Sequence, residues 1–263
     1  MQSHIAIVID TTIEHDRATA LATQLHLPII QHDAIHQYDL ILQFLNNKLS
    51  LQLTAEGAPG PISVDFLAGK YAHRRQYGGG KSQLLAKAIG LHKFKSPSVI
   101  DVTAGLGQDA FILASLGCNV QMIERSPIIA ALVSDALERA KNDPLFSSMQ
   151  FTLTIGDSLQ FLQQLTQENY PDIIYIDPMF PTRTKSALVK KEMRVLRAVV
   201  GDDVDADQLL YQARQIAKKR VVVKRPRHAP VIANQIPTLQ LKGESSRFDV
   251  YVNTEQNDMD SQP

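Results

Sequence analysis

The chain has 263 residues, of which 44% are hydrophobic and 21% charged, a composition with ample apolar content for a folded core. Basic and acidic side chains are equal in number, but acidic ones predominate in residues 1–60 and 251–263, so residues 61–250 carry net positive charge. A single cysteine, Cys118, excludes an internal disulfide framework, and no apolar stretch approaches the roughly 20 residues of a membrane helix. We therefore expect a soluble cytoplasmic protein with no membrane partner.

The first 60 residues are predicted to form a small N-terminal α/β subdomain. Apolar alternation and helical spacing indicate strands at residues 4–9, 39–44 and 49–53 and a helix at residues 17–25. Gly57-Ala58-Pro59-Gly60-Pro61 then marks a loop and a domain boundary. Residues 61–95 are expected to form a basic, glycine-rich loop and a helix that lead into the main domain.

The main domain is expected over residues 96–253, where strands and helices alternate. Strands are predicted at residues 99–102, 119–124, 151–155, 173–176 and 220–224, helices after Gly107 and at 128–140 and 206–218, and a hairpin at 239–241 and 248–252. This order predicts a doubly wound, mostly parallel, Rossmann-like α/β sheet, in which ligands bind beyond the carboxyl ends of the strands. The acidic tail, residues 254–263, is expected to be disordered.

A glycine turn joins the first of these strands to its helix. In Asp101-Val102-Thr103-Ala104-Gly105-Leu106-Gly107, the glycines permit a tight turn and the close approach of a ligand to the first amides of the helix. With Ala110 the stretch also fits the dinucleotide fingerprint, so by itself it does not separate a nicotinamide enzyme from a methyltransferase. A turn that needs glycine only for packing is the other explanation.

Acidic residues at neighbouring strand ends narrow the choice of ligand. Glu124 can accept hydrogen bonds from both hydroxyls of a ribose, and both a nicotinamide cofactor and the cofactor of a methyltransferase contain such a ribose. Asp157 and Ser158 can hold an adenine amino group, although Asp157 could equally serve as a helix N-cap. Asp101 is placed to bind the amino-acid end of S-adenosylmethionine, whereas the fingerprint of a dehydrogenase does not require a carboxylate at this position.

Asp177-Pro178-Met179-Phe180 follows the fourth predicted strand and carries the predicted chemistry. It resembles the Asp/Asn-Pro-Pro-Phe/Tyr signature of methyltransferases that act on exocyclic or amide nitrogens. A carboxylate and the Pro178 carbonyl would accept both N–H groups of an amine and direct its lone pair toward the methyl donor, and Phe180 would stack on a flipped base. Met179 replaces the usual second proline, and an ordinary Asp-Pro turn is the alternative explanation.

Basic residues surround this motif and suggest a polyanionic substrate. The candidates for RNA contact are Arg74, Arg75, Lys81, Lys190, Lys191, Arg194, Arg225 and Arg227. Gly80-Lys81-Ser82 is not a P-loop, because Arg75 stands where its first glycine is required and no apolar strand precedes it. Solvated surface charge is the alternative for all these cations, and the scattered histidines predict no metal site.

The chain resembles the bacterial small-subunit (16S) ribosomal RNA guanine-N2 methyltransferase family, of RsmJ type. The resemblance rests on residues 73–80, 101–111, 124–125, 177–181, 186–194 and 219–226. It implies the fold of a class I S-adenosylmethionine-dependent methyltransferase and N2 methylation of one guanosine, with ribosomal RNA or the small subunit as substrate. It also implies that a cofactor pocket is lined by Gln108, Asp109, Glu124, Arg125, Asp157, Ser158 and Asp177.

Other functions stay open from the residues alone. The tetrapeptide would equally serve a methyltransferase for adenine N6 in nucleic acid or for a protein amide nitrogen. A nucleotide- or RNA-binding module without catalysis belongs to another class, and a dehydrogenase is the alternative that the motifs favour least. The leading hypothesis is an enzyme with S-adenosylmethionine as cofactor, catalytic Asp177, Pro178 and Phe180, and Gly105 and Gly107 among its cofactor contacts.

Overall fold

The computed structural model describes residues 4–9, 14–68, 83–179, 191–200 and 205–253. Its centre is a seven-stranded sheet in the order β11-β12-β10-β9-β6-β7-β8. The strands are β6 (Ser98–Asp101), β7 (Asn119–Glu124), β8 (Phe151–Ile155), β9 (Ile173–Ile176), β10 (Arg220–Pro226), β11 (Leu239–Lys242) and β12 (Ser246–Val252). Only β11 and β12 run antiparallel to their neighbours, so the predicted mostly parallel sheet is confirmed.

Alternate residues of the central strands face two separate apolar cores. On β9, Ile173 and Tyr175 belong to one core, while Ile174 and Ile176 belong to the other. Continuous apolar runs are typical of parallel strands that are buried on both faces, and this is why four-residue segments such as β9 form here. The two cores make the sheet doubly wound, with helices on each side.

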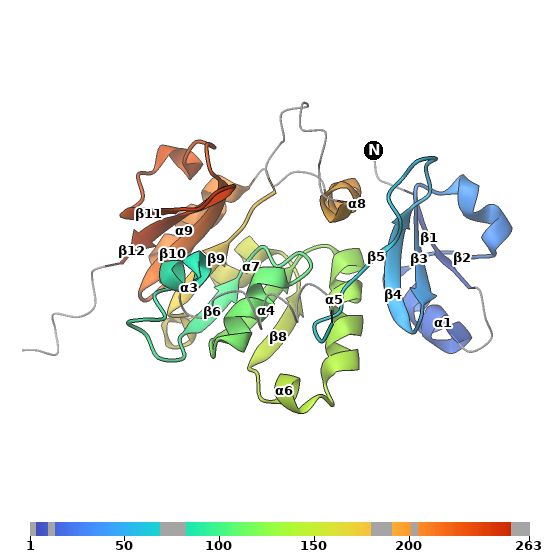
Figure 1. Ribbon diagram of the computed structural model, residues 1–263, viewed down its shortest axis with the longest axis horizontal. Coiled ribbons are helices and arrows are strands. Elements are labelled where there is room, and N and C mark those ends of the chain that lie inside the picture. The colour runs from blue at the N-terminus through green and yellow to red at the C-terminus, as the bar shows by residue number, and fades with distance from the viewer. Residues whose placement is uncertain (1–3, 10–13, 69–82, 180–190, 201–204, 254–263) are drawn as a thin grey trace, which may run out of the picture.

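The helices divide between these two faces (Figure 1). One core includes residues of α3 (Leu84–Ile89), α4 (Gln108–Ser115) and α5 (Pro127–Ala140). The other includes residues of α7 (Ser158–Gln164) and α9 (Ala206–Ile216). The short helix α6 (Pro144–Ser147) precedes β8. No helix in the described part of the chain is long and apolar enough to cross a membrane.

A second sheet of five strands contains the N-terminal residues. Its order is β2-β1-β3-β4-β5, formed by β1 (Ile5–Val8), β2 (Ile29–Ile30), β3 (Leu40–Leu45), β4 (Lys48–Leu53) and β5 (Ile62–Ser63), with α1 (His15–Leu25) packed beside it. Figure 1 shows this sheet next to α5 and α8 (Lys191–Val200). The sheet continues to Ser63, slightly beyond the expected boundary at residue 60.

The strand order places a topological switch point between β6 and β9. From β6 the chain proceeds outward through β7 and β8, and it then returns to β9 and proceeds the other way through β10. Loops that leave the carboxyl ends of β6 and β9 therefore diverge, and they leave a crevice between them. The glycine turn follows β6 and Asp177 follows β9, so both predicted motifs meet at this crevice.

Candidate active site

A cavity of about 800 Å³ lies at the carboxyl ends of the parallel strands. This volume is within the range of small-molecule and cofactor sites. Its wall includes residues from every parallel strand end and from α8, among them Asp101, Gly105, Gln108, Asp109, Glu124, Arg125, Asp157, Ser158, Asp177, Pro178 and Lys224. The sequence-predicted cofactor residues therefore gather around one space, with the exception of Gly107.

The two glycines of the turn face different surroundings. Both have left-handed backbone angles, with φ of 52° at Gly105 and 69° at Gly107, which favour glycine. A Cβ on Gly105 would meet only the Thr103 carbonyl, 4.0 Å away, whereas a Cβ on Gly107 would lie 3.1 Å from the Met122 sulfur and 3.3 Å from the Phe66 ring. Gly105 thus leaves space at the cavity, and Gly107 allows close packing beneath the turn.

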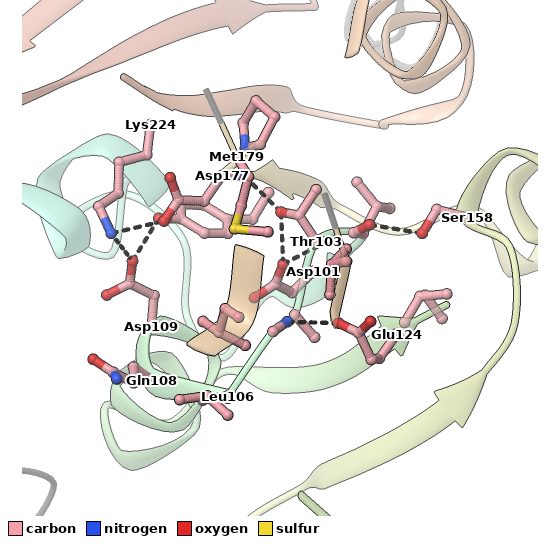
Figure 2. Close-up of a pocket in the computed structure, with 18 of the residues that line it drawn as sticks. Asp101, Thr103, Leu106, Gln108, Asp109, Glu124, Ser158, Asp177, Met179 and Lys224 are labelled. Carbon is pink, nitrogen blue, oxygen red and sulfur yellow. Dashed lines mark hydrogen bonds and ion pairs between the residues drawn. The ribbon is translucent and has the colours of Figure 1, made fainter. Parts of the chain in front are cut away.

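Glu124 ties the glycine turn to the next strand end. Its carboxylate accepts the Gly105 amide at 2.9 Å through Oε2 (Figure 2). It also accepts the Ser126 amide at 2.8 Å through Oε1. The side chain is only 6% exposed, yet it lines the cavity. Because each carboxylate oxygen can accept more than one hydrogen bond, this arrangement is compatible with additional ribose hydroxyls.

Asp101 and Asp177 are connected through the hydroxyl of Thr103. Asp101 accepts the Thr103 amide at 3.1 Å and its hydroxyl at 3.4 Å, while the Asp177 amide donates to the same hydroxyl oxygen at 2.6 Å. Burial raises the pKa of Asp101 to about 8, and the charges of Asp109 and Asp177 add to this rise against the opposing Thr103 hydrogen bonds. Asp101 is therefore mostly protonated at neutral pH in this structure.

Lys224 bridges two of the acidic residues, and sequence reasoning missed this contact. Its Nζ lies 2.6 Å from Asp109 Oδ2 and 2.8 Å from Asp177 Oδ2 (Figure 2). Burial opposes the charge of Lys224, but the two carboxylates outweigh it and leave its pKa above the usual value. The position of Lys224 at the carboxyl end of β10 is the sequence feature that could have indicated a role in the site. Arg225 and Arg227 lie at the same end, so this position alone does not single out Lys224.

Asp157 and Ser158 begin α7 at the edge of the cavity. Asp157 Oδ1 accepts the Gln160 amide at 2.9 Å, so the alternative N-cap role is present in the structure. Ser158 Oγ donates to the Val102 carbonyl at 2.6 Å and thereby fixes the start of α7 against the glycine turn. Arg125 pairs with Asp205 at 3.3 Å across the cavity rim.

Helix α8, which the helical spacing of Lys190, Arg194 and Arg197 predicts, supplies an apolar wall to the cavity. Met193, Leu196 and Val200 line the cavity, together with Met179 after β9. Their spacing of three and four residues is typical of a buried helix face. In the sequence, the cations on the same helix favour a solvent-facing role for it and mask this pattern. Helix α8 itself packs against α5, β4 and β5, so the N-terminal sheet supports this wall.

The predicted RNA-binding cations have different environments. Arg194 and Arg227 are exposed, whereas Arg225 is 2% exposed and its guanidinium Nε donates to the Pro230 carbonyl at 3.1 Å. Burial, with the charge of Arg247, lowers the pKa of Arg225 to about 10. The side chain of Lys191 and all of Arg74, Arg75, Lys81, Lys190 and Phe180 lie outside what the structure describes.

The described residues of the sheet and its cavity form no metal centre. Among the residues that the structure describes, no three His, Cys, Asp or Glu side chains are grouped so that they could hold a metal ion. The cavity is lined instead by carboxylates, by cations such as Arg125 and Lys224 and by apolar side chains, which suit an adenosine and a charged amino-acid group. The open approach to Gly105 provides room for such a ligand.

Fold and site together define a class I S-adenosylmethionine-dependent methyltransferase. The family model described as "Putative SAM-dependent methyltransferase" matches residues 21–253. A solved structure of a SAM-dependent methyltransferase from Neisseria gonorrhoeae is similar over 96% of this chain and 97% of its own, with a TM-score of 0.71 and 35% identity.

The chain belongs to the ribosomal RNA small subunit methyltransferase J family. A relative of that name from Coxiella burnetii is 48% identical over 252 residues, which are 96% of this chain and 98% of the relative. Another from Dechloromonas aromatica is 50% identical over 236 residues, 89% of this chain and 94% of the relative. The expected family, enzyme class and cofactor are thereby confirmed.

Proposed function

We propose that the protein transfers a methyl group from S-adenosylmethionine to the exocyclic N2 of a guanosine in 16S ribosomal RNA. The observation that carries the proposal is the position of Asp177-Pro178 directly after β9, with the Asp177 carboxylate on the same cavity as the Gly105 turn. The two motifs together would bring the amino group that accepts the methyl and the donor that carries it to one cavity. The names of the relatives support small-subunit RNA as the substrate.

Within this proposal the cofactor supplies an electrophilic methyl group on its sulfonium. Glu124 would hold the ribose hydroxyls, Asp157 and Ser158 the adenine, and Asp101 the amino-acid end. The rest of the pocket would be formed by Gly105, Gln108, Asp109 and Arg125. Gly107 would allow the close packing beneath the turn that keeps Gly105 in place. Leu106 and Met179 would exclude water from the apolar part of the cavity, because both side chains line it.

Asp177 would position the amine and receive its proton. Its carboxylate and the Pro178 carbonyl would accept the two N–H bonds of the amino group, so that the nitrogen lone pair lies above the ring plane. When the new N–C bond forms and the donor S–C bond breaks, the nitrogen must lose one proton, and Asp177 is the nearest proposed acceptor. Phe180 would stack on the base, and positioning would account for most of the acceleration.

The exposed cations are proposed to hold the RNA backbone. Arg194 on α8 and Arg227 after β10 carry exposed side chains near the cavity. Arg74, Arg75, Lys81, Lys190 and Lys191 are proposed for the same role on the resemblance alone. Arg225 is the weakest candidate, because its guanidinium is buried against Pro230.

Removal of the Asp177 carboxylate tests the proposal most directly. With labelled donor and small-subunit RNA from a strain that lacks the enzyme, the wild-type protein is expected to label one guanosine, and Asp177→Ala to lose at least about 100-fold in turnover. Cofactor affinity, measured by calorimetry, should fall far less. Glu168→Ala, at an exposed acidic position, is the matched control and should leave turnover unchanged.

Each alternative corresponds to a different result of this assay. Label in DNA adenine or in protein would favour another amino-methyltransferase. Cofactor binding without turnover on any of the three substrates would favour a non-catalytic module. Full turnover by Asp177→Ala would contradict the catalytic role of this residue.

A further inference from the structure

Lys224 presents an ammonium group beside the proposed catalytic carboxylate. Its three N–H donors have two protein acceptors in the described part of the chain, Asp109 Oδ2 at 2.6 Å and Asp177 Oδ2 at 2.8 Å. The side chain lines the cavity and is 28% exposed. The cavity wall therefore displays a cationic donor immediately next to a carboxylate oxygen (Figure 2).

This ammonium is anchored from behind by Asp109. The Asp109 side chain is 7% exposed, and its Oδ2 also accepts the hydroxyl of the fully buried Tyr175 at 2.8 Å. Burial and the charge of Asp109 raise the pKa of Tyr175 well above its usual value, so the tyrosine stays a neutral donor. Asp109 thus fixes Lys224 independently of Asp177, and the lysine can keep its place when Asp177 binds a substrate.

A carboxylate and an ammonium side by side match one nucleobase edge. The Watson–Crick edge of guanine presents the O6 acceptor, the N1–H donor and the N2 amino donor in that order. Adenine presents an amino donor and then the N1 acceptor. A flipped base is read through this edge. In guanine, O6 can accept from the ammonium, and N1–H and N2–H can both donate to the carboxylate. In adenine, the amino group would face the ammonium, so that two donors meet, and N1 would face the carboxylate, so that two acceptors meet.

We infer that Lys224 selects guanine by donating to its O6 while Asp177 accepts from N1–H and N2–H. The inference rests on the proposed function and specifies its substrate. In this arrangement Asp177 Oδ2, already next to Lys224, receives N1–H, and Oδ1 receives one N2–H. The Pro178 carbonyl receives the other. A site that pairs its polar groups with one base discriminates strongly against a base that leaves them unpaired.

The test removes the O6 contact from both sides. Small-subunit RNA fragments would carry either guanine or 2-aminopurine at the mapped nucleotide, since 2-aminopurine keeps the N2 amino group and lacks O6. We would measure kcat/KM for both RNAs with the wild-type enzyme and with Lys224→Met. Loss of N1–H in 2-aminopurine affects both enzymes alike, so the change in the guanine preference isolates the contact between Lys224 and O6.

The wild-type preference for guanine should fall by about tenfold or more in Lys224→Met, the effect of one charged hydrogen bond. Lys224→Arg, which keeps the cation but moves its donors, should retain part of the preference. Lys219→Met is the matched control, because Lys219 pairs with Asp172 at 2.8 Å at the opposite end of β10. That variant should keep the wild-type preference, and thermal melting would establish that each variant is folded.

The outcomes distinguish guanine selection by Lys224 from the proposed methyl transfer itself. Equal losses on both RNAs would mean that Lys224 only supports Asp177, and they would overturn the inference while the proposed function stands. A wild-type enzyme that leaves the guanine RNA unmethylated would overturn the proposed function and the inference together.

Discussion

Asp101 shows how a single buried carboxyl couples the site to stability. It is 2% exposed, and its pKa is raised to about 8 in the ligand-free protein, chiefly by burial. An acid whose pKa is higher in the folded state than in the unfolded state, where it is about 3.9, keeps a proton that the unfolded chain releases. Between these two values the folded state therefore loses stability as pH rises.

Asp101→Asn should remove this pH dependence. Asparagine keeps an oxygen that can accept the Thr103 amide, but it carries no proton to lose and no charge to bury. We expect the variant to melt several degrees above the wild type at about pH 8.5, with little difference at about pH 4.5. Melting curves of both ligand-free proteins across this range would measure the gap, and a constant gap at every pH would contradict the assignment to Asp101.

At the scale of elements, the glycine turn combines two separate requirements. Gly105 and Gly107 lie two residues apart and share a left-handed backbone, yet one faces the cavity and the other faces packed side chains. Alanine in this conformation costs about 1–2 kcal/mol at either position. Only the alanine at 107 would also press against Met122 and Phe66.

Gly107→Ala should therefore destabilise the fold more than Gly105→Ala does. We expect the free energy of unfolding to fall by about 1–2 kcal/mol in Gly105→Ala and by about 2–4 kcal/mol in Gly107→Ala, as measured in urea. Cofactor affinity should show the opposite order once both proteins are folded, because a methyl group on Gly105 enters the cavity. Similar effects of both variants on affinity would argue against this division of roles.

The same elements show what the sequence could predict. Apolar runs such as Ile173–Ile176 identify buried strands, because strands covered on both faces require continuous hydrophobicity. The order of these strands then predicts that the glycine turn and the Asp-Pro motif lie at the same edge of the sheet. The spacing of Lys190, Arg194 and Arg197 predicts a helix in this region, but the apolar wall that α8 gives the cavity and the Lys224 bridge could not be found from strand order. Whether a lysine in a basic cluster faces solvent or a carboxylate depends on a residue distant in sequence, here Asp109, 115 positions away.

At the scale of the whole molecule, the two sheets share one hydrophobic core. Buried residues of the N-terminal sheet, such as Leu40 and Leu51, belong to the same cluster as Phe111 and Ile129 of the main domain. Such continuity favours unfolding in a single transition, because this shared core is complete only when both parts are folded. It also means that α8, which packs on both parts, depends on their contact.

Asp135 on α5 is the polar centre of that contact. Its side chain is 7% exposed and accepts the Arg17 guanidinium at 2.7 Å, Arg139 Nε at 2.9 Å and the Leu49 amide of β4 at 3.0 Å. Arg139 in turn donates to the Val64 carbonyl just after β5. One carboxylate therefore joins α1, α5 and β4, and its charge is compensated by two arginines.

Asp135→Asn should destabilise both sheets together. The amide cannot replace three charge-assisted contacts at once, and Arg139, which is 18% exposed, loses its nearest carboxylate while it keeps Val64 and the more distant Asp65. We therefore expect a loss of about 2–4 kcal/mol in the free energy of unfolding. Circular dichroism and near-ultraviolet tyrosine absorbance in urea should give coincident transitions in the wild type and the variant. Glu138→Gln on the same helix, whose side chain is 69% exposed, should change stability by less than about 0.5 kcal/mol. If the variant instead unfolded in two separate steps, the sheets would be independent units, and support of the α8 wall by the N-terminal sheet would be contradicted.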